Sequence, residues 1–275
     1  MTDGRALRLE GIEERYERYK EKIRNYTIMD DIFMRNVLKE QGCTEYMLQV
    51  IMNQKNLQVL EQTLQKDYKN LQGRSAILDC VARDERARQF NVEIQGDNEG
   101  ASPERARYHS CLLDMNILSP REPFTGLPET YIIFITRNDV LGYDRIICHI
   151  TRKVEEEGKD FGDGSHIIYV NSKKREDTEL GKLMHDLHCK ESGEMHSKIL
   201  ASRVRELKET EKGVSEMCRD MEEIYGEGME EGERKKARET VLSLAELKMS
   251  EEQISQIVKM PLEVVQGWIE ESLAI

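Results

Sequence analysis

Two acidic residues and an amide lie among apolar residues in the first half of the chain, where their side chains could bind a metal ion. Asp79 lies in the segment AILDCVA (76–82), and Glu93 and Gln95 lie in NVEIQ (91–95). A carboxylate among Ile, Leu and Val is costly to bury unless it has a partner. Carboxylate oxygens suit Mg²⁺, which can activate water and stabilise charge at phosphorus.

Both segments have the composition of β-strands, and the polar turn between them predicts an antiparallel hairpin over 75–83 and 89–95. Residues two apart in a strand share one face, so Glu93 and Gln95 point the same way. If Asp79 faces them across the hairpin, two carboxylates and one amide converge. The spacing alone favours ordinary solvent-facing residues on a purely structural hairpin, because this pattern by itself is weak.

The composition limits the class of protein. The chain has 275 residues, of which 38% are hydrophobic and 34% charged, and its net charge is -12. This predicts one moderate α/β core with a helical appendage. The negative net charge argues against a generally basic surface that binds nucleic acid, but it leaves a local basic groove possible.

The cysteine pattern and the polar start of the chain predict a cellular compartment. Six scattered cysteines without a CxxC pair predict reduced, buried thiols. The sequence contains no apolar run of membrane-spanning length and no signal-peptide pattern. We therefore expect a cytoplasmic protein with no membrane partner.

The apolar periodicity predicts further elements on both sides of the hairpin. Residues 1–25 have the composition of a polar helix or tail. The other expected elements are helices over 27–38, 44–53 and 103–117, strands over 131–135, 145–151 and 166–171, and helices over 178–190, 196–225 and 229–248, followed by two short helices.

Several details of these elements are also predicted. Gly42 is expected to end the helix over 27–38, and a turn is expected at 162–164. Residues 57–66 fit both a helix and a strand, and the sequence pattern alone leaves the choice open. The buried face of the helix over 103–117 is expected to consist of Tyr108, Cys111, Leu112 and Met115. Glycines are expected to interrupt the C-terminal helices at Gly226, Gly228 and Gly232.

Five segments occur in an order and spacing typical of one nuclease family. They are DDIF (30–33), NLQGRSAILD (70–79), FNVEIQ (90–95), RY (107–108) and YIIFIT (131–136). In these segments the sequence resembles the PD-(D/E)XK nuclease family transposases, the Rpn-like recombination-promoting nucleases.

This resemblance implies an α/β fold with a restriction-endonuclease-like αβββαβ core and a mostly α-helical C-terminal tail. It makes residues 57–66 the first strand. The expected division is an N-terminal polar segment (1–25), a nuclease-like core (26–190) and a helical C-terminal region (191–275) with a helix-turn-helix-like end.

The resemblance also implies roles for the central residues. Asp79 and Glu93 stand at the family's two metal-binding acidic positions, and the backbone carbonyl of Ile94 is a further candidate ligand. Gln95 stands where the wider superfamily has a Lys. The implied activity is Mg²⁺- or Mn²⁺-dependent endonucleolytic cleavage of DNA, associated with recombination or transposition.

Two departures from the family pattern bear on activity. Asp30 matches the acid of the family's first helix, with Asp31 as a competing neighbour, but Met34 replaces the Lys that often follows Phe33. Gln95 can position water but supplies no positive charge. A catalytically weak or inactive nuclease fold that binds DNA or protein is therefore the alternative function.

Other polar residues are weaker candidates. Arg105, Arg107 and Tyr108 follow the hairpin on a helix and could contact a phosphate backbone; structural roles fit them equally well. His109 is expected to be a structural or surface residue.

A possible zinc site is suggested by three further residues, His185, His188 and Cys189. The sequence shows no second ligand pair to complete it, so they are expected to be surface residues.

The end of the chain predicts two short packed helices. Ser250 and Gln253 form a capping box, and Pro261 opens the last helix. Their expected small core consists of Ile254, Ile257, Val258, Val264, Val265 and Trp268. The last helix has few basic residues, which favours packing or homo-oligomer formation through these helices over base reading.

Overall fold

The computed structural model describes residues 11–68, 75–96 and 99–273 of the chain. It contains two compact units, Met1–Cys218 and Arg219–Ile275. The division predicted at residues 25 and 190 stays a prediction. Among the described residues, no helix is both long and apolar enough to span a membrane.

The first unit combines helices with a mixed sheet. Its helices are α1 (Ile12–Asn25), α2 (Asp31–Leu38), α3 (Gln41–Ile51), α4 (Pro103–Met115), α5 (Glu179–Leu187), α6 (Lys198–Glu209) and the first part of α7 (Glu211–Glu246). Its strands are β1 (Val59–Tyr68), β2 (Ala76–Asp84), β3 (Gln89–Gln95), β4 (Thr130–Thr136), β5 (Ile147–Ile150), β6 (Lys153–Val154), β7 (Lys159–Asp160) and β8 (Ser165–Asn171). Short 3-10 helices lie at Glu99–Ala101, Phe124–Gly126 and Ser192–Glu194.

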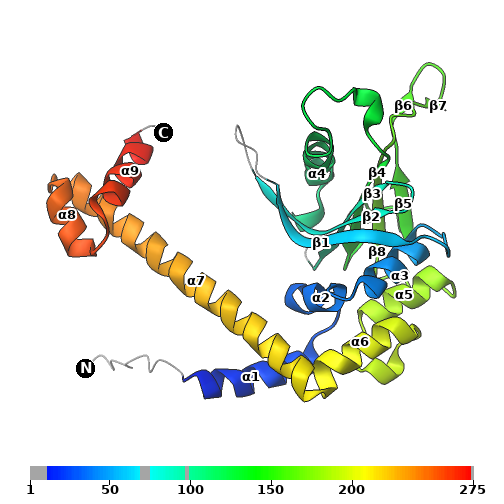
Figure 1. The fold of residues 1–275 in the computed structure, drawn as a ribbon, viewed down its shortest axis with the longest axis horizontal. Helices are drawn as coiled ribbons and strands as arrows, with labels where there is room; N and C mark the ends of the chain where they lie inside the picture. The colour runs from blue at the N-terminus through cyan, green and yellow to red at the C-terminus, as the bar shows by residue number, and fades with distance from the viewer. Residues whose placement is uncertain (1–10, 69–74, 97–98, 274–275) are drawn as a thin grey trace. The chain divides into compact units, whose positions relative to one another are not determined.

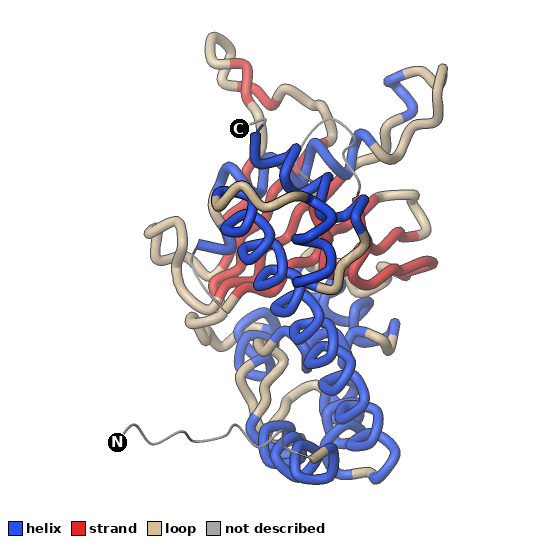
Figure 2. Tube along the Cα trace, turned by 90° about the vertical axis from the view of Figure 1, so that its left-hand side faces the viewer, coloured by secondary structure: helices blue, strands red, loops and turns tan. Residues whose placement is uncertain are grey.

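Six of these strands form one sheet in the order β1-β2-β3-β4-β8-β5. Strands β1, β2 and β3 pair antiparallel, β4 is parallel to both β3 and β8, and β5 closes the edge antiparallel to β8. Helix α4 lies on one side of the sheet and α2, α3 and α5 lie on the other (Figure 1). Figure 2 shows the strands of this sheet running side by side.

This architecture confirms the predicted α/β class and the αβββαβ order, which runs from α3 through β1, β2, β3 and α4 to β4. Residues 57–66 fall largely in β1, as the resemblance implied. All seven residues of β4 are buried because helices cover both faces of the sheet around it. The rings of Phe134 on β4 and Tyr169 on β8 stack with centroids 5.5 Å apart.

Helix α4 begins where the sequence predicts, because Ser102 caps it and Pro103 occupies its first position. The Ser102 Oγ accepts a hydrogen bond from the backbone N–H of Arg105 at 3.2 Å. The predicted buried face was wrong for Cys111 and Met115, which are exposed, and right for Leu112. The residues buried on α4 are Ala106, His109, Ser110, Leu112 and Leu113. The two polar ones meet polar partners on the sheet: His109 Nδ1 lies 3.7 Å from Glu93 Oε1, and Ser110 Oγ lies 2.9 Å from Ser165 Oγ on β8.

Several predicted boundaries were wrong. Gly42 does not end α2; it lies in the first turn of α3, and α2 ends at Leu38. The turn at 162–164 is preceded by the small β6–β7 hairpin. The helix expected over 196–225 is interrupted at Thr210, where α6 ends and α7 begins.

The three glycines expected to interrupt the C-terminal helices lie inside the continuous helix α7, at positions 226, 228 and 232. Each glycine in an exposed helix costs about 1 kcal/mol relative to alanine. Strong helix formers, chiefly Glu, Met, Lys and Arg, surround them and offset that cost.

The second unit consists of the remainder of α7, α8 (Glu251–Val258) and α9 (Leu262–Leu273). The capping box of Ser250 and Gln253 is confirmed, and Pro261 directly precedes α9. Val241, Ile254, Val265 and Trp268 form its buried core. Ile257 was wrongly included in that core, since 54% of it is exposed.

Candidate active site

Asp79 and Glu93 lie where the paired part of the β2–β3 hairpin ends. The last paired residues are Cys80 and Val92, so the same register places Asp79 opposite Glu93. There the backbone N–H of Asp79 donates a hydrogen bond to the Glu93 carboxylate, at 3.1 Å from Oε1. A side chain thus takes over from the backbone ladder in holding the two strands together.

Strand β2 is irregular around Asp79. Leu78 and Val81 are three residues apart, yet both belong to the hydrophobic cluster beneath α4, which regular alternation does not allow. On the neighbouring strand, Gln65 has a positive φ of 50°, and its Nε2 donates to Asp79 Oδ1 at 3.2 Å. The half-buried Asp79 carboxylate therefore accepts hydrogen bonds from two neighbouring strands: from Gln65 on β1 and from the backbone of Ile94 on β3.

Several neighbours of Asp79 shift the pKa of its carboxyl in opposite directions. Burial raises the pKa of Asp79, and the negative charge of Asp31 on α2 raises it further. Hydrogen bonds from Gln65 and from the backbone of Ile94 lower this pKa, as does the positive charge of Arg35. Helix α2 therefore contributes both signs of charge beside Asp79.

Glu93 is fully buried and faces α4. Arg105 Nη2 lies 3.5 Å from Oε2 of Glu93, and His109 Nδ1 lies 3.7 Å from Oε1. Burial, followed by the charge of Asp79, raises the pKa of Glu93 to about 7; contacts with the Asp79 N–H, Asn91 and Arg105 act against this shift. The two acids are close enough for the charge of one to oppose ionisation of the other.

Gln95 and Ile94 complete the predicted central set. The Gln95 side chain lies so close to Gly100 that a Cβ added there would be 2.1 Å from its Oε1. The side chain of Ile94 is buried, and its backbone lies beyond the last paired residues of the β2–β3 ladder. The Gln95 side chain therefore lies against the 3-10 helix Glu99–Ala101, which precedes α4.

The two candidate acids of α2 have different surroundings. Asp31 pairs with Arg35, with Oδ2 2.6 Å from Nη2, and its charge acts on Asp79. Asp30 Oδ2 instead accepts hydrogen bonds from the backbone N–H and the hydroxyl of Thr27, at 2.7 and 2.9 Å. Of these two acids, Asp31 is the one that influences the pair on the hairpin.

A hollow of about 680 Å³ lies beside this site, between the start of β2 and the first turns of α4. Arg105, Arg107 and Tyr108 all line it, so the structure brings the three predicted phosphate-contacting residues together. The other lining residues are Ser75, Ala76, Ile77, Ser102, Glu104 and His109.

Sequence reasoning missed Gln65 and His109 as neighbours of the two acids. Gln65 lies in the segment whose strand character the pattern left open. His109 follows Arg105 by one helical turn, and Arg105 Nε donates to His109 Nε2 at 3.3 Å. That spacing was a usable signal, because residues four apart share a helix face.

Comparison with known proteins gives a family-level result. No curated protein and no solved structure matches the chain. One family model, described as PD-(D/E)XK nuclease family transposase, matches residues 43–237, a span that includes the hairpin, α4 and β4. The chain therefore belongs to the PD-(D/E)XK nuclease family transposases, as the sequence resemblance predicted.

Proposed function

We propose that this protein is a metal-dependent DNA endonuclease associated with recombination or transposition. Membership in a nuclease family indicates phosphodiesterase chemistry. The observation that carries the proposal for this chain is the fully buried Glu93 beside Asp79. Two neighbouring carboxylates, one in an apolar interior, are expensive to maintain unless a cation or a proton offsets their charge.

The donor atoms fit a hard divalent cation. Asp79, Glu93 and the backbone carbonyl of Ile94 offer only oxygen, which Mg²⁺ and Mn²⁺ prefer. Such an ion, when bound, supplies an activated water and stabilises charge at phosphorus. Arg105 is the cation nearest to Glu93, and at 3.5 Å from Oε2 it compensates this carboxylate only in part.

The surrounding side chains have separate tasks in this proposal. Gln95 positions the attacking water through its amide. His109 and Arg105 hold the Glu93 carboxylate from the α4 side, at 3.7 and 3.5 Å. Arg107 and Tyr108 contact the DNA backbone in the hollow that they line.

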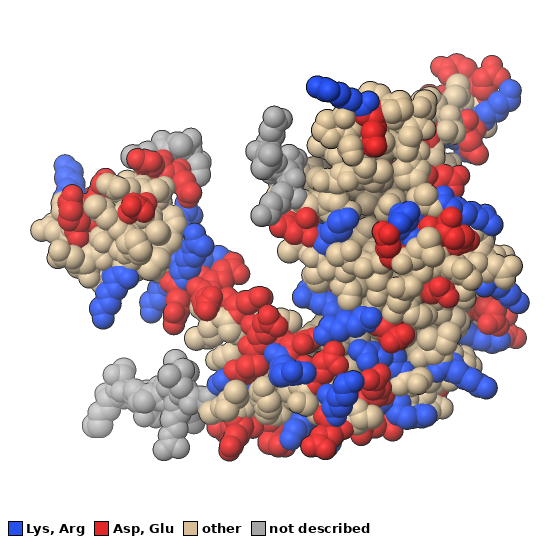
Figure 3. Space-filling model, in the orientation of Figure 1, with Lys and Arg blue, Asp and Glu red and all other residues tan. Residues whose placement is uncertain are grey.

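DNA would bind through this local patch. Acidic and basic side chains are interspersed on the face seen in Figure 3, and the net charge is -12. Binding would therefore depend on a few arginines near the hollow, and a small number of phosphate contacts predicts weak salt dependence.

Gln95 also supports the alternative function, a nuclease fold that binds DNA or protein without efficient cleavage. An amide supplies no positive charge where the wider superfamily has a Lys, so charge developing at phosphorus would be less well stabilised. If the alternative fold binds DNA, the two functions share DNA binding and differ in the rate of cleavage.

The experiment that separates them is a nicking assay with supercoiled plasmid and Mg²⁺ or Mn²⁺. We expect wild-type protein to nick the plasmid, and Asp79→Ala and chelator to abolish nicking. Glu61→Gln is the matched control, because Glu61 is an exposed acid on β1 paired with Arg83. Nicking that survives Asp79→Ala would reject the proposal, and DNA binding without nicking would support the alternative.

A further inference from the structure

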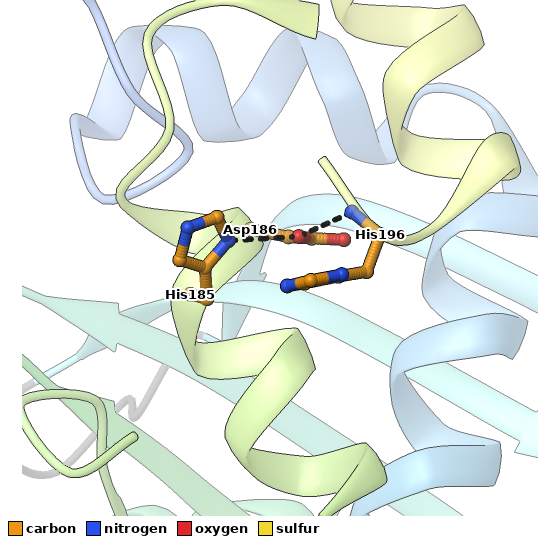
Figure 4. A group of neighbouring side chains, drawn as sticks. All are labelled: His185, Asp186 and His196. Atoms are coloured by element: carbon orange, nitrogen blue, oxygen red, sulfur yellow. Dashed lines mark hydrogen bonds and ion pairs between the residues drawn. The ribbon is translucent and has the colours of Figure 1, made fainter. Parts of the chain in front are cut away.

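A second cluster of metal-ligating side chains lies between α5 and α6, on residues the nuclease proposal does not use. His185 and Asp186 are in the last turn of α5, and His196 directly precedes Ser197, the N-cap of α6. One donor atom from each residue lies within 4.8 Å of the other two. Figure 4 shows both imidazole rings next to the Asp186 carboxylate.

We propose that His185, Asp186 and His196 form a binding site for a Zn²⁺-type ion. Two imidazole nitrogens and a carboxylate oxygen are the ligands of a three-residue zinc site, whose fourth position holds water or a ligand. This donor set differs from the oxygen-only set at Asp79 and Glu93, which suits Mg²⁺. Zinc binding at this site does not depend on nuclease activity.

The distances are close to those required around an ion. Ligand bonds of about 2.0–2.2 Å place neighbouring donors of a tetrahedral ion roughly 3.3–3.6 Å apart. His185 Nδ1 already lies 3.3 Å from Asp186 Oδ1. The donor atoms of the three residues lie within 4.8 Å of one another, so a side-chain rotation that moves a ring nitrogen by about 1 Å would complete the approach.

The carboxylate is rigidly held while the imidazoles can move. Asp186 is completely buried, and its two oxygens accept the backbone N–H groups of His196 and Ser197 at 2.8 and 2.7 Å. The His185 side chain is 33% exposed, and His196 is exposed. A fixed carboxylate with two adjustable rings can close around an ion without refolding the backbone.

The backbone bonds alone give Asp186 a structural role, since they tie α6 to α5. They leave one acceptor site on each oxygen, and they do not account for two imidazoles beside a buried carboxylate. Cys189, wrongly expected at the surface, is buried, and its side chain lies against the last turn of α5, where Sγ donates to the backbone carbonyl of His185 at 3.5 Å. Its Sγ lies 3.4 Å from His185 Nδ1, outside the three-residue group. It therefore helps to orient the ring and is not assigned as a ligand.

A bound ion would tie together two helices of the layer behind the sheet. Both α5 and α6 pack against α3. The ion would connect the end of α5 to the start of α6 and so stabilise this layer. Binding to the folded state alone stabilises that state, so a bound ion should raise the melting temperature.

The test is calorimetric titration of the full chain with Zn²⁺ in excess Mg²⁺, which occupies oxygen-only sites. We expect one Zn²⁺ per chain, with affinity reduced at least about 10-fold in His185→Ala and in His196→Ala. His149→Ala is the matched control, because His149 is an exposed histidine on β5, and its affinity should equal that of the wild type. Asp186 is left unchanged because its bonds hold the loop.

A second measurement guards against misfolded variants. Circular dichroism without metal should show the same helix content in all four proteins, and Zn²⁺ should raise the melting temperature of the wild type and of His149→Ala only. Zn²⁺ affinity equal to that of the wild type in either His185→Ala or His196→Ala would overturn the proposal. Absence of wild-type binding at about 100 µM Zn²⁺, where a zinc site should be filled, would overturn it as well.

Discussion

The backbone N–H of Asp79 donates a 3.1 Å hydrogen bond to the carboxylate of Glu93, at the point where the β2–β3 ladder ends. This bond holds one acidic residue against the other in an interior where Glu93 is fully buried. The arrangement is unfavourable for two ionised groups, because burial and mutual repulsion both oppose charge. The consequences can be measured in stability, in DNA binding and in turnover.

Stability should depend on pH through Glu93. Its pKa rises from an ordinary value of 4.5 to about 7 on folding. Between these values the folded protein keeps a proton that the unfolded chain releases, so rising pH favours unfolding. In metal-free buffer, the free energy of unfolding of the wild type should fall relative to that of Glu93→Gln between about pH 4.5 and pH 7. The expected slope is at most about 1.4 kcal/mol per pH unit.

Chemical denaturation at a series of pH values measures this difference. Glu61→Gln is the control, since its ion pair with Arg83 lowers the pKa of Glu61 and predicts no loss of relative stability over that range. A constant difference between wild type and Glu93→Gln from pH 4.5 to 7 would show that Glu93 ionises normally.

The sequence predicts the local parts of this site well. The hairpin, the cap of α4 and the buried strand β4 depend on contiguous patterns: a polar turn, Ser102 before Pro103, and an unbroken apolar run. These patterns predict the structure correctly because the residues that form each pattern are neighbours in the chain.

The sequence does not predict what tertiary contacts decide. His109 lies 3.7 Å from Glu93 because α4 packs over β3, and the spacing of Arg105 and His109 shows only that these two residues share a helix face. His196 reaches Asp186 because the chain reverses between α5 and α6, and the spacing of these residues matches no ligand motif. The continuity of α7 through three glycines is a different case, since it follows from the local helix formers around them, which the sequence reasoning underweighted.

Gln95 can be tested without changing it. A methyl group at Gly100 would lie 2.1 Å from Gln95 Oε1, so Gly100→Ala should push the amide aside. We expect DNA cleavage to slow roughly 10- to 100-fold, because small misplacements of positioning groups are costly. Gly96→Ala is the matched control, since nothing lies within 4 Å of its Cβ position. Equal rates for the two variants would show that Gln95 has no positioning role.

Arg107 should contribute to DNA binding through charge alone. It is exposed and lines the hollow beside the site. Arg107→Ala should weaken DNA binding and reduce the slope of log K against log salt concentration by about 1. Fluorescence anisotropy at several salt concentrations measures both. Arg86→Ala, in the exposed hairpin turn, should leave the slope unchanged; a slope unaltered by Arg107→Ala is the contrary result.

The hairpin itself should depend on a buried ion pair at its turn. Asp84 Oδ2 lies 2.6 Å from Arg88 Nη2, and the two side chains are 0% and 7% exposed. Asp84→Ala would leave a buried guanidinium without its carboxylate partner and should lower the free energy of unfolding by about 3–5 kcal/mol. Urea denaturation measures the loss. Glu61→Ala breaks an exposed pair on the same sheet and should have a much smaller effect; equal losses would contradict this view of the turn.

The most direct test of the central claim is the single-turnover rate of plasmid cleavage by wild type and Glu93→Gln at saturating Mn²⁺. Glutamine keeps the size of the side chain and removes its charge, so the fold should persist while the oxygen ligand weakens. We predict a rate at least about 100-fold lower for Glu93→Gln, the size of effect seen when one stabilising group is lost from a catalytic site. A Glu93→Gln protein that cleaves as fast as the wild type would contradict the assignment of this pair as the metal-binding site.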